Sequence, residues 1–164
     1  MINTQDYIYS ILEKIHDPEI PVLTIIDLGI VRDVIIIDEQ TIEIIITPTY
    51  SGCPAMDVIS FEIKLALLET GYKNIKVTYT LSPAWTTDWM SELGKRKLLE
   101  YGIAPPKKKS SRVNKMLFEE ETNISCPQCN SSNTNQLSEF GSTACKSLYK
   151  CNDCNEVFDH FKCH

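Results

Sequence analysis

The sequence lacks any long hydrophobic run and any excess of basic residues, and each absence excludes a class of protein. No apolar stretch approaches the about 18 residues that a membrane-spanning helix needs. Residues 1–6 have neither the basic part nor the apolar part of a signal peptide, so we expect a cytoplasmic protein with no membrane partner. With 16 Lys plus Arg against 22 Asp plus Glu, the net charge of −6 argues against a surface built for nucleic acid.

Cysteine is the residue that this sequence has in excess. The chain holds 7 cysteines, and an odd number cannot pair completely within one monomer, so metal binding or thiolate chemistry is favoured over a disulfide framework. Two Cys-x-x-Cys motifs, Cys126 to Cys129 and Cys151 to Cys154, have the spacing of a four-cysteine zinc ribbon. Structural zinc is the favoured occupant, and iron, an iron–sulfur cluster or a pair of redox thiols are the alternatives.

Composition divides the chain into three parts. Residues 1–103 hold nearly all of the Ile and Leu and carry more acidic than basic residues, so the main core is expected there. Residues 104–121 begin with Ala-Pro-Pro-Lys-Lys-Lys, have little to bury and are interpreted as a linker. Residues 122–164 hold six cysteines and form the predicted zinc ribbon, whose folding depends on the metal.

Hydrophobic periodicity predicts an α+β fold for the first part: a small αββαβα two-layer domain with a three-stranded mixed sheet, followed by the C-terminal zinc ribbon. The first helix begins near Asn3 or Thr4 and ends before Asp17, and two β-branched runs form a hairpin. The remaining elements follow in the order strand, strand, helix, strand and helix, at residues 31–37, 41–47, 54–69, 75–81 and 86–101.

The helical crossover between the second and third strands makes those strands parallel. Three loops, at residues 27–29, 48–53 and 82–86, are therefore expected at one edge of the sheet. Ligand sites on α/β sheets favour the edge beyond the carboxyl ends of the strands, so this edge is the candidate site.

Cys53 lies in this region, immediately before the helix that starts at about Pro54. Unpaired N–H groups and the helix dipole stabilise a thiolate, so we expect Cys53 to be more acidic than a free cysteine. Its residue type allows three roles: a ligand for a soft metal, a nucleophile or an inert residue at the helix start. Asp27, at the same predicted edge, either orients a ligand or serves as a turn residue.

Several other features have alternative interpretations. Cys145 and Cys163, with His160 and His164 nearby, form either a second metal site, a redox pair or two unliganded thiols. Trp85 and Trp89 are expected in the core or at an interface. The helix at residues 54–69 is apolar around much of its circumference, which indicates burial by a partner chain, a homodimer included.

Longer motifs resemble a known family. The segments at residues 17–21 (Asp-Pro-Glu-Ile-Pro), 27–31 (Asp-Leu-Gly-Ile-Val) and 47–54 (Thr-Pro-Thr-Tyr-Ser-Gly-Cys-Pro) look like the small domain of SufT-type iron–sulfur maturation proteins. Further segments, at residues 83–91, 102–106, 139–146 and 160–163, resemble the PaaD family, also called PaaJ, which is encoded with the multicomponent phenylacetyl-CoA epoxidase of aerobic phenylacetate degradation.

This resemblance implies a non-catalytic protein that supports maturation of the iron–sulfur or iron centres of the epoxidase. Cys53 is then the candidate contact for a transient iron ion or iron–sulfur cluster, and epoxidase subunits or iron–sulfur carrier proteins are the expected partners. The helical bundle that holds the Glu and Glu-x-x-His residues of a di-iron oxygenase is not predicted, which argues against a catalytic subunit. A thiol redox protein and a nucleic-acid-binding zinc ribbon using the basic stretch at residues 107–115 are the alternatives.

Overall fold

The computed structural model describes residues 4–106 and 124–162. These residues form two compact units, the first ending at Lys97 and the second running over Leu98–Lys162. None of the helices in the described ranges combines the length and the hydrophobicity needed to cross a membrane.

The first unit opens with helix α1, Gln5–Leu12, which begins where the sequence predicts. Thr4 is its N-cap, and the Thr4 hydroxyl accepts a hydrogen bond from the backbone N–H of Tyr7 at 3.4 Å. Such a bond satisfies one of the N–H groups that a helix leaves unpaired at its start. One face of α1, which includes Ile8 and Leu12, is buried in the core.

Three strands form the sheet of the first unit in the order β1-β2-β3. Strand β1, Val31–Ile36, runs antiparallel to β2, Thr41–Ile46, and β2 runs parallel to β3, Asn74–Tyr79. Helix α2, Ala55–Glu69, makes the crossover between the two parallel strands. The predicted mixed three-stranded sheet is therefore confirmed.

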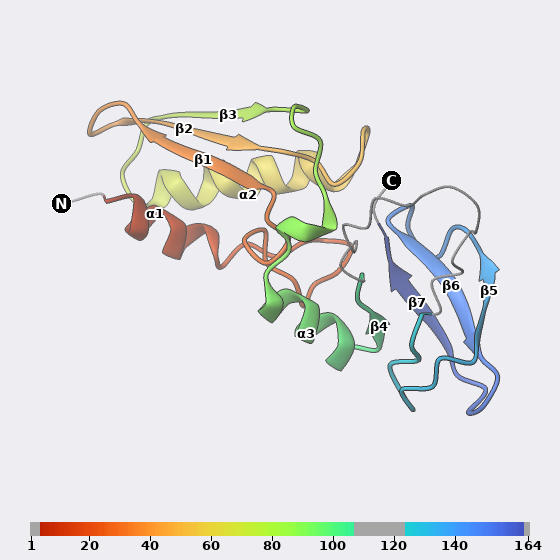
Figure 1. The fold of residues 1–164 in the computed structure, drawn as a ribbon. Coiled ribbons are helices and arrows are strands. Elements are labelled where there is room, and N and C mark those ends of the chain that lie inside the picture. Colours follow the sequence, from red (N-terminus) through yellow and green to blue (C-terminus); the bar gives the residue numbers. More distant parts are fainter. Residues whose placement is uncertain (1–3, 107–123, 163–164) are drawn as a thin grey trace, which may run out of the picture. The chain divides into compact units, whose positions relative to one another are not determined.

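Helices α1 and α2 cover one face of this sheet (Figure 1). On β2, Ile42, Ile44 and Ile46 point into the core and are fully buried, because successive side chains of a strand point to opposite faces. They pack against the layer that contains Ile59 and Ile63 of α2, both buried. Burial of large aliphatic side chains of this kind contributes about 1.5 to 3 kcal/mol each.

The last helix differs from the prediction of one continuous helix over residues 86–101. A 3₁₀ turn, η1, covers Thr87–Trp89, and helix α3 covers Glu92–Glu100, with extended backbone at Met90 between them. The break has a local cause: the Ser91 hydroxyl accepts the N–H of Gly94 at 2.8 Å, as an N-cap does, and thereby starts a new helix.

The second unit is built on a four-stranded sheet in the order β4-β7-β6-β5. Its strands are β4, Ile103–Ala104; β5, Thr134–Ser138; β6, Lys146–Cys151; and β7, Val157–Phe161. Strand β6 runs antiparallel to both β5 and β7, whereas β4 runs parallel to β7. The core beneath them contains Ala104, Ile124, Cys126, Cys151 and Phe158.

The predicted boundary between the first part and the linker falls inside strand β4. Its residues Ile103 and Ala104 pair with Asp159 and His160 of β7, so both belong to the sheet of the second unit. The predicted boundaries, 1–103, 104–121 and 122–164, stay a prediction, and most of the proposed linker lies outside the described residues.

Candidate functional site

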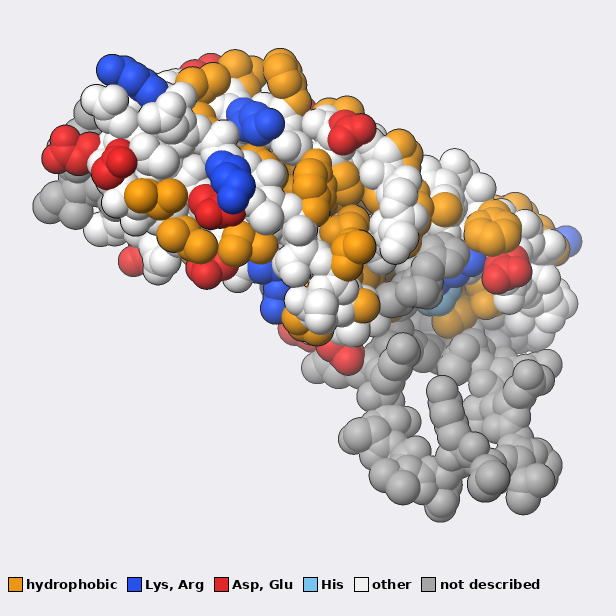
Figure 2. Space-filling view, turned by 90° about the horizontal axis from the view of Figure 1, so that it is seen from above, with side chains coloured by type: hydrophobic (Ala, Val, Ile, Leu, Met, Phe, Trp, Pro, Cys, Tyr) orange, Lys and Arg blue, Asp and Glu red, His pale blue; other side chains and the backbone are white. Residues whose placement is uncertain are grey.

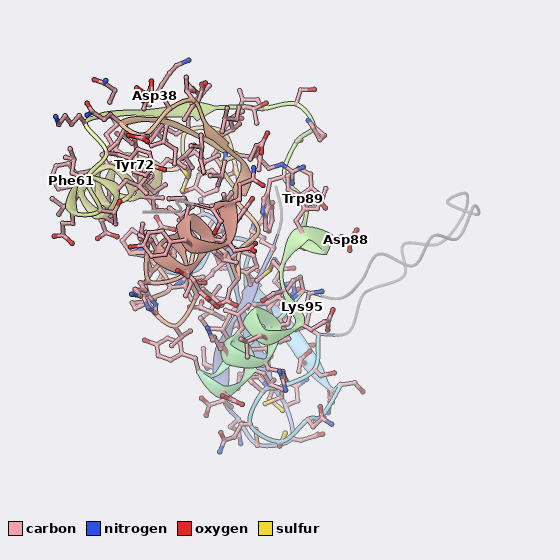
Figure 3. All side chains as sticks on the ribbon, turned by 90° about the vertical axis from the view of Figure 1, so that its left-hand side faces the viewer. Asp38, Phe61, Tyr72, Asp88, Trp89 and Lys95 are labelled. Carbon is pink, nitrogen blue, oxygen red and sulfur yellow. The ribbon has the colours of Figure 1, made fainter. Side chains whose placement is uncertain are left out.

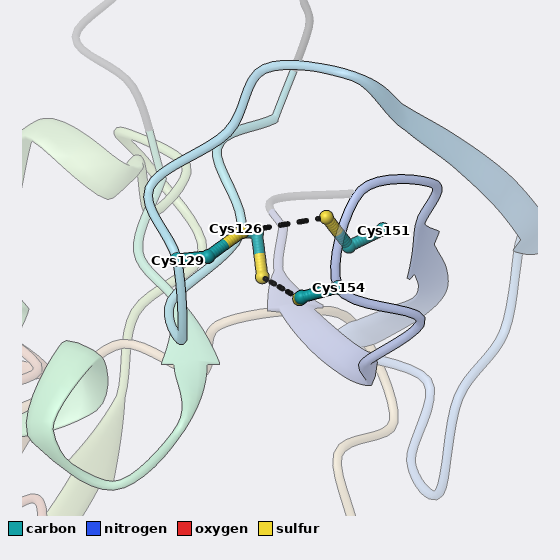
Figure 4. Close-up of side chains that lie close together, drawn as sticks. All are labelled: Cys126, Cys129, Cys151 and Cys154. Carbon is teal, nitrogen blue, oxygen red and sulfur yellow. Dashed lines mark hydrogen bonds between the residues drawn. The ribbon is translucent and has the colours of Figure 1, made fainter.

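Cys126, Cys129, Cys151 and Cys154 bring their four sulfur atoms within 4.8 Å of one another (Figure 4). The Sγ atoms of Cys126 and Cys154 are 3.7 Å apart, and those of Cys129 and Cys151 are 3.6 Å apart. A tetrahedron of sulfurs around zinc at about 2.3 Å has edges of about 3.8 Å. The donor set therefore fits a tetrahedral zinc ion, and it leaves no open coordination position for catalysis.

The turns that carry these cysteines are shaped by asparagine. Asn130 and Asn155, each immediately after a Cys-x-x-Cys motif, have φ values of 60° and 63°, in the left-handed region that Asn tolerates better than most residues. The N–H of Asn130 donates to the carbonyl of Cys126 at 2.9 Å, which closes the first turn. Each motif thus ends in a tight turn that directs both of its sulfurs to the same point.

Asp153 connects the two motifs and was not singled out from the sequence. Its carboxylate accepts hydrogen bonds from the Ser131 hydroxyl and, at 2.8 Å, from the Asn133 side-chain amide. These bonds hold the pKa of Asp153 below its usual range, with the bond from Ser131 as the largest cause. The only indication in the sequence is its place inside the second Cys-x-x-Cys motif.

Without a cation, the pKa values of Cys151 and Cys154 differ widely. Hydrogen bonds, first of all from the backbone N–H of Cys154, lower the pKa of Cys151 to about 7. The N–H of Glu156 lowers the pKa of Cys154, but burial and the neighbouring thiols raise it to about 12. Four adjacent sulfurs cannot all ionise at neutral pH by themselves, so a divalent cation is what allows four thiolates here.

Cys53 lies at the end of the loop that joins β2 to α2. Gly52 has a φ of 82°, and the N–H of Cys53 donates to the carbonyl of Tyr50 at 3.3 Å, so the chain turns sharply just before the thiol. The carbonyl of Cys53 accepts the N–H of Met56 in the first turn of α2. Within the described ranges, no side chain caps this helix start, and Cys53 itself is half-buried.

The expectation that Cys53 is unusually acidic is wrong. The pKa of the Cys53 thiol is raised, with burial as the largest cause, although hydrogen bonds from the N–H of Ala55 and from the Tyr50 side chain lower it. The negative charges of Glu19 and Asp17 raise the pKa further. Cys53 is thus a neutral thiol at pH 7, and the same negative charges favour a cation that replaces its proton.

Asp27 is 5% exposed, and its carboxylate is fully engaged within the first unit. The Ser91 hydroxyl donates to Oδ1 at 2.8 Å, and the Lys97 ammonium donates to Oδ2 at 2.6 Å. The Thr24 backbone N–H donates to Oδ2 at 3.2 Å. Burial alone would raise the pKa of Asp27, but these hydrogen bonds hold it below its usual value.

The loops at residues 27–29 and 82–86 meet, as predicted. The indole N–H of Trp85 donates to the carbonyl of Leu28 at 2.9 Å, and Trp85 is 3% exposed, which confirms its assignment to the core. Gly29 has a φ of 66°, and a Cβ there would lie 2.2 Å from the carbonyl oxygen of Trp89. Only glycine allows this close approach.

Asp27 and Cys53 are the two residues predicted at this edge. Among the residues that the structure describes, no hydrogen bond connects them. Among the described residues, Asp27 forms its hydrogen bonds with Thr24, Ser91 and Lys97. The neighbours that influence the acidity of Cys53 are on the loop of residues 17–19, on its own loop and at the first residue of α2. The segment at 17–19 contributed to the family resemblance, but no pattern in the sequence places it beside Cys53.

Cys145 is separate from the four-sulfur cluster. It is buried, and its sulfur lies 3.0 Å from the hydroxyl of Thr143. Cys163 and His164, its predicted companions in a second metal site, lie outside the described residues. The basic stretch at residues 107–115, the basis of the nucleic-acid alternative, also lies outside them.

Two family models match the chain. The model described as PaaD zinc beta ribbon domain matches residues 110–162. The model described as iron-sulfur cluster assembly protein matches residues 5–78. The match to the ribbon agrees with the four-sulfur geometry and supports structural zinc in the second unit.

Two similar proteins match somewhat more than half of the chain. An Fe-S protein maturation auxiliary factor of Porphyromonas gingivalis is 32% identical over 62% of this chain and 94% of its own length. The crystal structure of a domain of unknown function, DUF59, from Bacillus anthracis is 30% identical, covers 57% of this chain and 90% of that chain, and has a TM-score of 0.54.

A further relative extends over nearly the whole sequence. This relative, a putative 1,2-phenylacetyl-CoA epoxidase subunit of Escherichia coli strain K12, is 47% identical over 95% of this chain and 91% of its own length. Both units are thus present in that relative, in the same order. Together with this epoxidase subunit, the chain belongs to the PaaD family.

Proposed function

We propose that this protein is a non-catalytic accessory factor that matures or inserts the iron–sulfur or iron centres of a phenylacetyl-CoA epoxidase. The iron–sulfur cluster assembly model matches residues 5–78, a relative named as a maturation factor matches 62% of the chain, and the epoxidase relative matches 95% of it. On this proposal, the partners are epoxidase subunits or iron–sulfur carrier proteins. The site of action is the cytoplasm, where thiols stay reduced.

One observation carries the proposal: Cys53 is a half-buried, neutral thiol within the electrostatic influence of Glu19 and Asp17. An iron cation replaces the thiol proton, and the two negative charges favour the cation while they disfavour a bare thiolate. Iron is the cargo here. Because iron must displace the Cys53 proton, iron binding at this site is reversible and depends on pH. A protein that passes iron on to another protein needs such reversible binding.

Asp27 takes a positioning role in this proposal. Both of its oxygens are occupied by hydrogen bonds, so it acts by fixing the turn at residues 27–29 and the start of α3. Structural zinc in the second unit keeps the ribbon folded, and the ribbon then serves as a docking module.

The test is the metal and sulfide content of anaerobically purified wild-type and Cys53→Ala protein, with an ultraviolet–visible spectrum of each. We expect one zinc per chain in both proteins, and iron that is lost only in the variant. Cys145→Ala is the matched control, because it removes another buried thiol outside the zinc cluster and should leave the iron content unchanged. Zinc alone in all three proteins, even after iron and sulfide are supplied, would refute an iron role for Cys53.

A further inference from the structure

Helix α2 exposes four large hydrophobic side chains in one line. Val58, Phe61, Leu65 and Leu68 are 45%, 66%, 48% and 51% exposed, and we call these four residues the apolar seam. Successive members are separated by three, four and three residues, which places them above one another on one side of a helix. Figure 3 shows Phe61 on the outer side of α2.

The apolar seam is not part of the core of the first unit. The residues of α2 that face the core include Ile59, Ile63 and Leu67, all at most 1% exposed. At about 100° per residue, the seam lies on the side of the helix directly opposite these three side chains. A surface helix ordinarily has polar residues on that side, so α2 is apolar on both sides.

The face of the sheet that the helices leave open has a different character. Its hydrophobic side chains are interspersed with charged ones (Figure 2). The Lys76 ammonium and the Glu43 carboxylate form an ion pair there at 2.9 Å. Exposed contiguous hydrophobic surface on a folded domain marks an interaction site, and the apolar seam has that continuity.

The charges beside the apolar seam limit the choice of partner. Glu62 and Glu69 border it on one side, and Asp57 and Lys64 border it on the other, all of them exposed. Three of the four bordering charges are negative. A partner that complements both features has a hydrophobic stripe with basic residues along its border.

The spacing of the apolar seam favours a helix as that partner. Intervals of three and four residues are those of a coiled-coil seam, in which side chains of one helix insert between those of another. A second copy of α2 fits poorly. An antiparallel pair would bring Glu62 against Glu62 and Lys64 against Lys64. A parallel pair would bring Asp57 against Glu62, and its one favourable charge contact, Lys64 with Glu69, would only offset that repulsion. The negative border also opposes an anionic membrane surface.

We propose that the apolar seam of α2 is the docking surface for an amphipathic helix of another protein, whose hydrophobic stripe is bordered by Lys or Arg. Four side chains that are about half exposed bury much less than the about 800 Å² that each partner buries in a standard interface. The association is therefore weak and reversible. It does not depend on the iron role of Cys53.

A pair of designed peptides tests this surface directly. Both form amphipathic helices of three heptads with Leu at the seam positions; one has Lys along both borders, and the other has Glu. We expect the Lys peptide to bind the full-length, zinc-loaded protein about tenfold more tightly than the Glu peptide in a fluorescence-anisotropy titration, with weakening as salt is added.

Variants separate the apolar seam from general charge attraction. Phe61→Ser with Leu65→Ser keeps the charge of the protein and should weaken binding of the Lys peptide about tenfold or more. Ile37→Ser is the matched control, because Ile37 is 60% exposed and lies outside the seam, and it should bind like the wild type. Because all three side chains are exposed, circular dichroism should show unchanged folding.

Two results would overturn the proposal. Equal binding of the Lys peptide by the wild type and by Phe61→Ser, Leu65→Ser protein would show attraction to acidic charge alone. In sedimentation equilibrium, a wild-type dimer that the same substitutions dissociate would show that a second copy occupies the seam. A loss of iron in Cys53→Ala with unaltered peptide binding would support both proposals separately, since the two readouts are independent.

Discussion

The Lys97 ammonium lies 2.6 Å from Oδ2 of Asp27, although the two residues are 70 positions apart in the sequence. The Asp27 side chain is 7% exposed and that of Lys97 is 31% exposed, so the pair is shielded from most of the solvent. Ser91 donates to the other Asp27 oxygen. Through these two hydrogen bonds, the Asp27 carboxylate links the start and the middle of α3 to the turn that precedes β1.

Substitution Lys97→Met should destabilise the first unit by about 2 kcal/mol, because it keeps the aliphatic stem but leaves a buried carboxylate without its cation. Urea unfolding followed by tryptophan fluorescence measures this change. Lys76→Met is the control: it also removes a cation from an ion pair, but Lys76 is 71% exposed, and a loss below about 0.5 kcal/mol is expected. Equal effects of the two substitutions would contradict a special role for Lys97.

The Asp27 carboxylate also predicts a dependence of stability on pH. Its pKa is lower in the folded protein than in the unfolded chain, so its stabilising contribution is complete above the unfolded value of about 3.9 and is lost as the pH falls through the folded value. The urea midpoint of the wild type should therefore fall more steeply below about pH 4 than that of Asp27→Asn. Both tryptophans, Trp85 and Trp89, are in the first unit, so their fluorescence reports this unit alone. Parallel pH profiles would rule out the contribution of Asp27.

Cys53 should react slowly with alkylating reagents at neutral pH. Because burial and two negative charges raise its pKa, the midpoint of its alkylation rate should lie above the ordinary value of about 8.5. Glu19→Gln should lower this midpoint, since it removes one of those charges, whereas Glu13→Gln on the exposed end of α1 should not. Mass spectrometry of the Cys53 peptide after brief iodoacetamide treatment at several pH values measures the rate. A midpoint below that of a free thiol would restore the expectation of an acidic Cys53.

Hydrophobic alternation and local turn chemistry were enough to predict much of the fold. The alternation along β2, the Thr4 cap and the crossover through α2 all depend on residues close in sequence. The two Cys-x-x-Cys motifs specify their geometry in the same way, because each turn needs only four consecutive residues.

The parts that could not be predicted depend on distant residues. The cap that Ser91 forms on Gly94 is local, but the hydrogen bond between Ser91 and Asp27 joins positions 64 apart, and no local pattern shows that bond. The acidity of Cys53 also depends on distant residues. The hydrogen bond from the helix start lowers the pKa of the thiol, but burial and the negative charges of Asp17 and Glu19 raise it, and the pKa is raised overall. Burial of a half-covered thiol follows from tertiary packing and not from its position before a helix.

Asp153 provides the last prediction, because its hydrogen bonds to Ser131 and Asn133 join the two motifs that hold the metal. Asp153→Ala removes this connection but none of the four sulfurs, so zinc should still bind, with an affinity lowered about tenfold. Competition with a chromophoric chelator measures the affinity. Asn135→Ala is the matched control, since Asn135 contacts Asn152 at 3.3 Å and does not contact Asp153, and its zinc affinity should equal that of the wild type. Cys129→Ala should abolish stoichiometric zinc binding and unfold the ribbon. If Asp153→Ala binds zinc as tightly as the wild type, the sulfur positions are set by the turns after each motif alone, where Asn130 and Asn155 adopt the left-handed conformation.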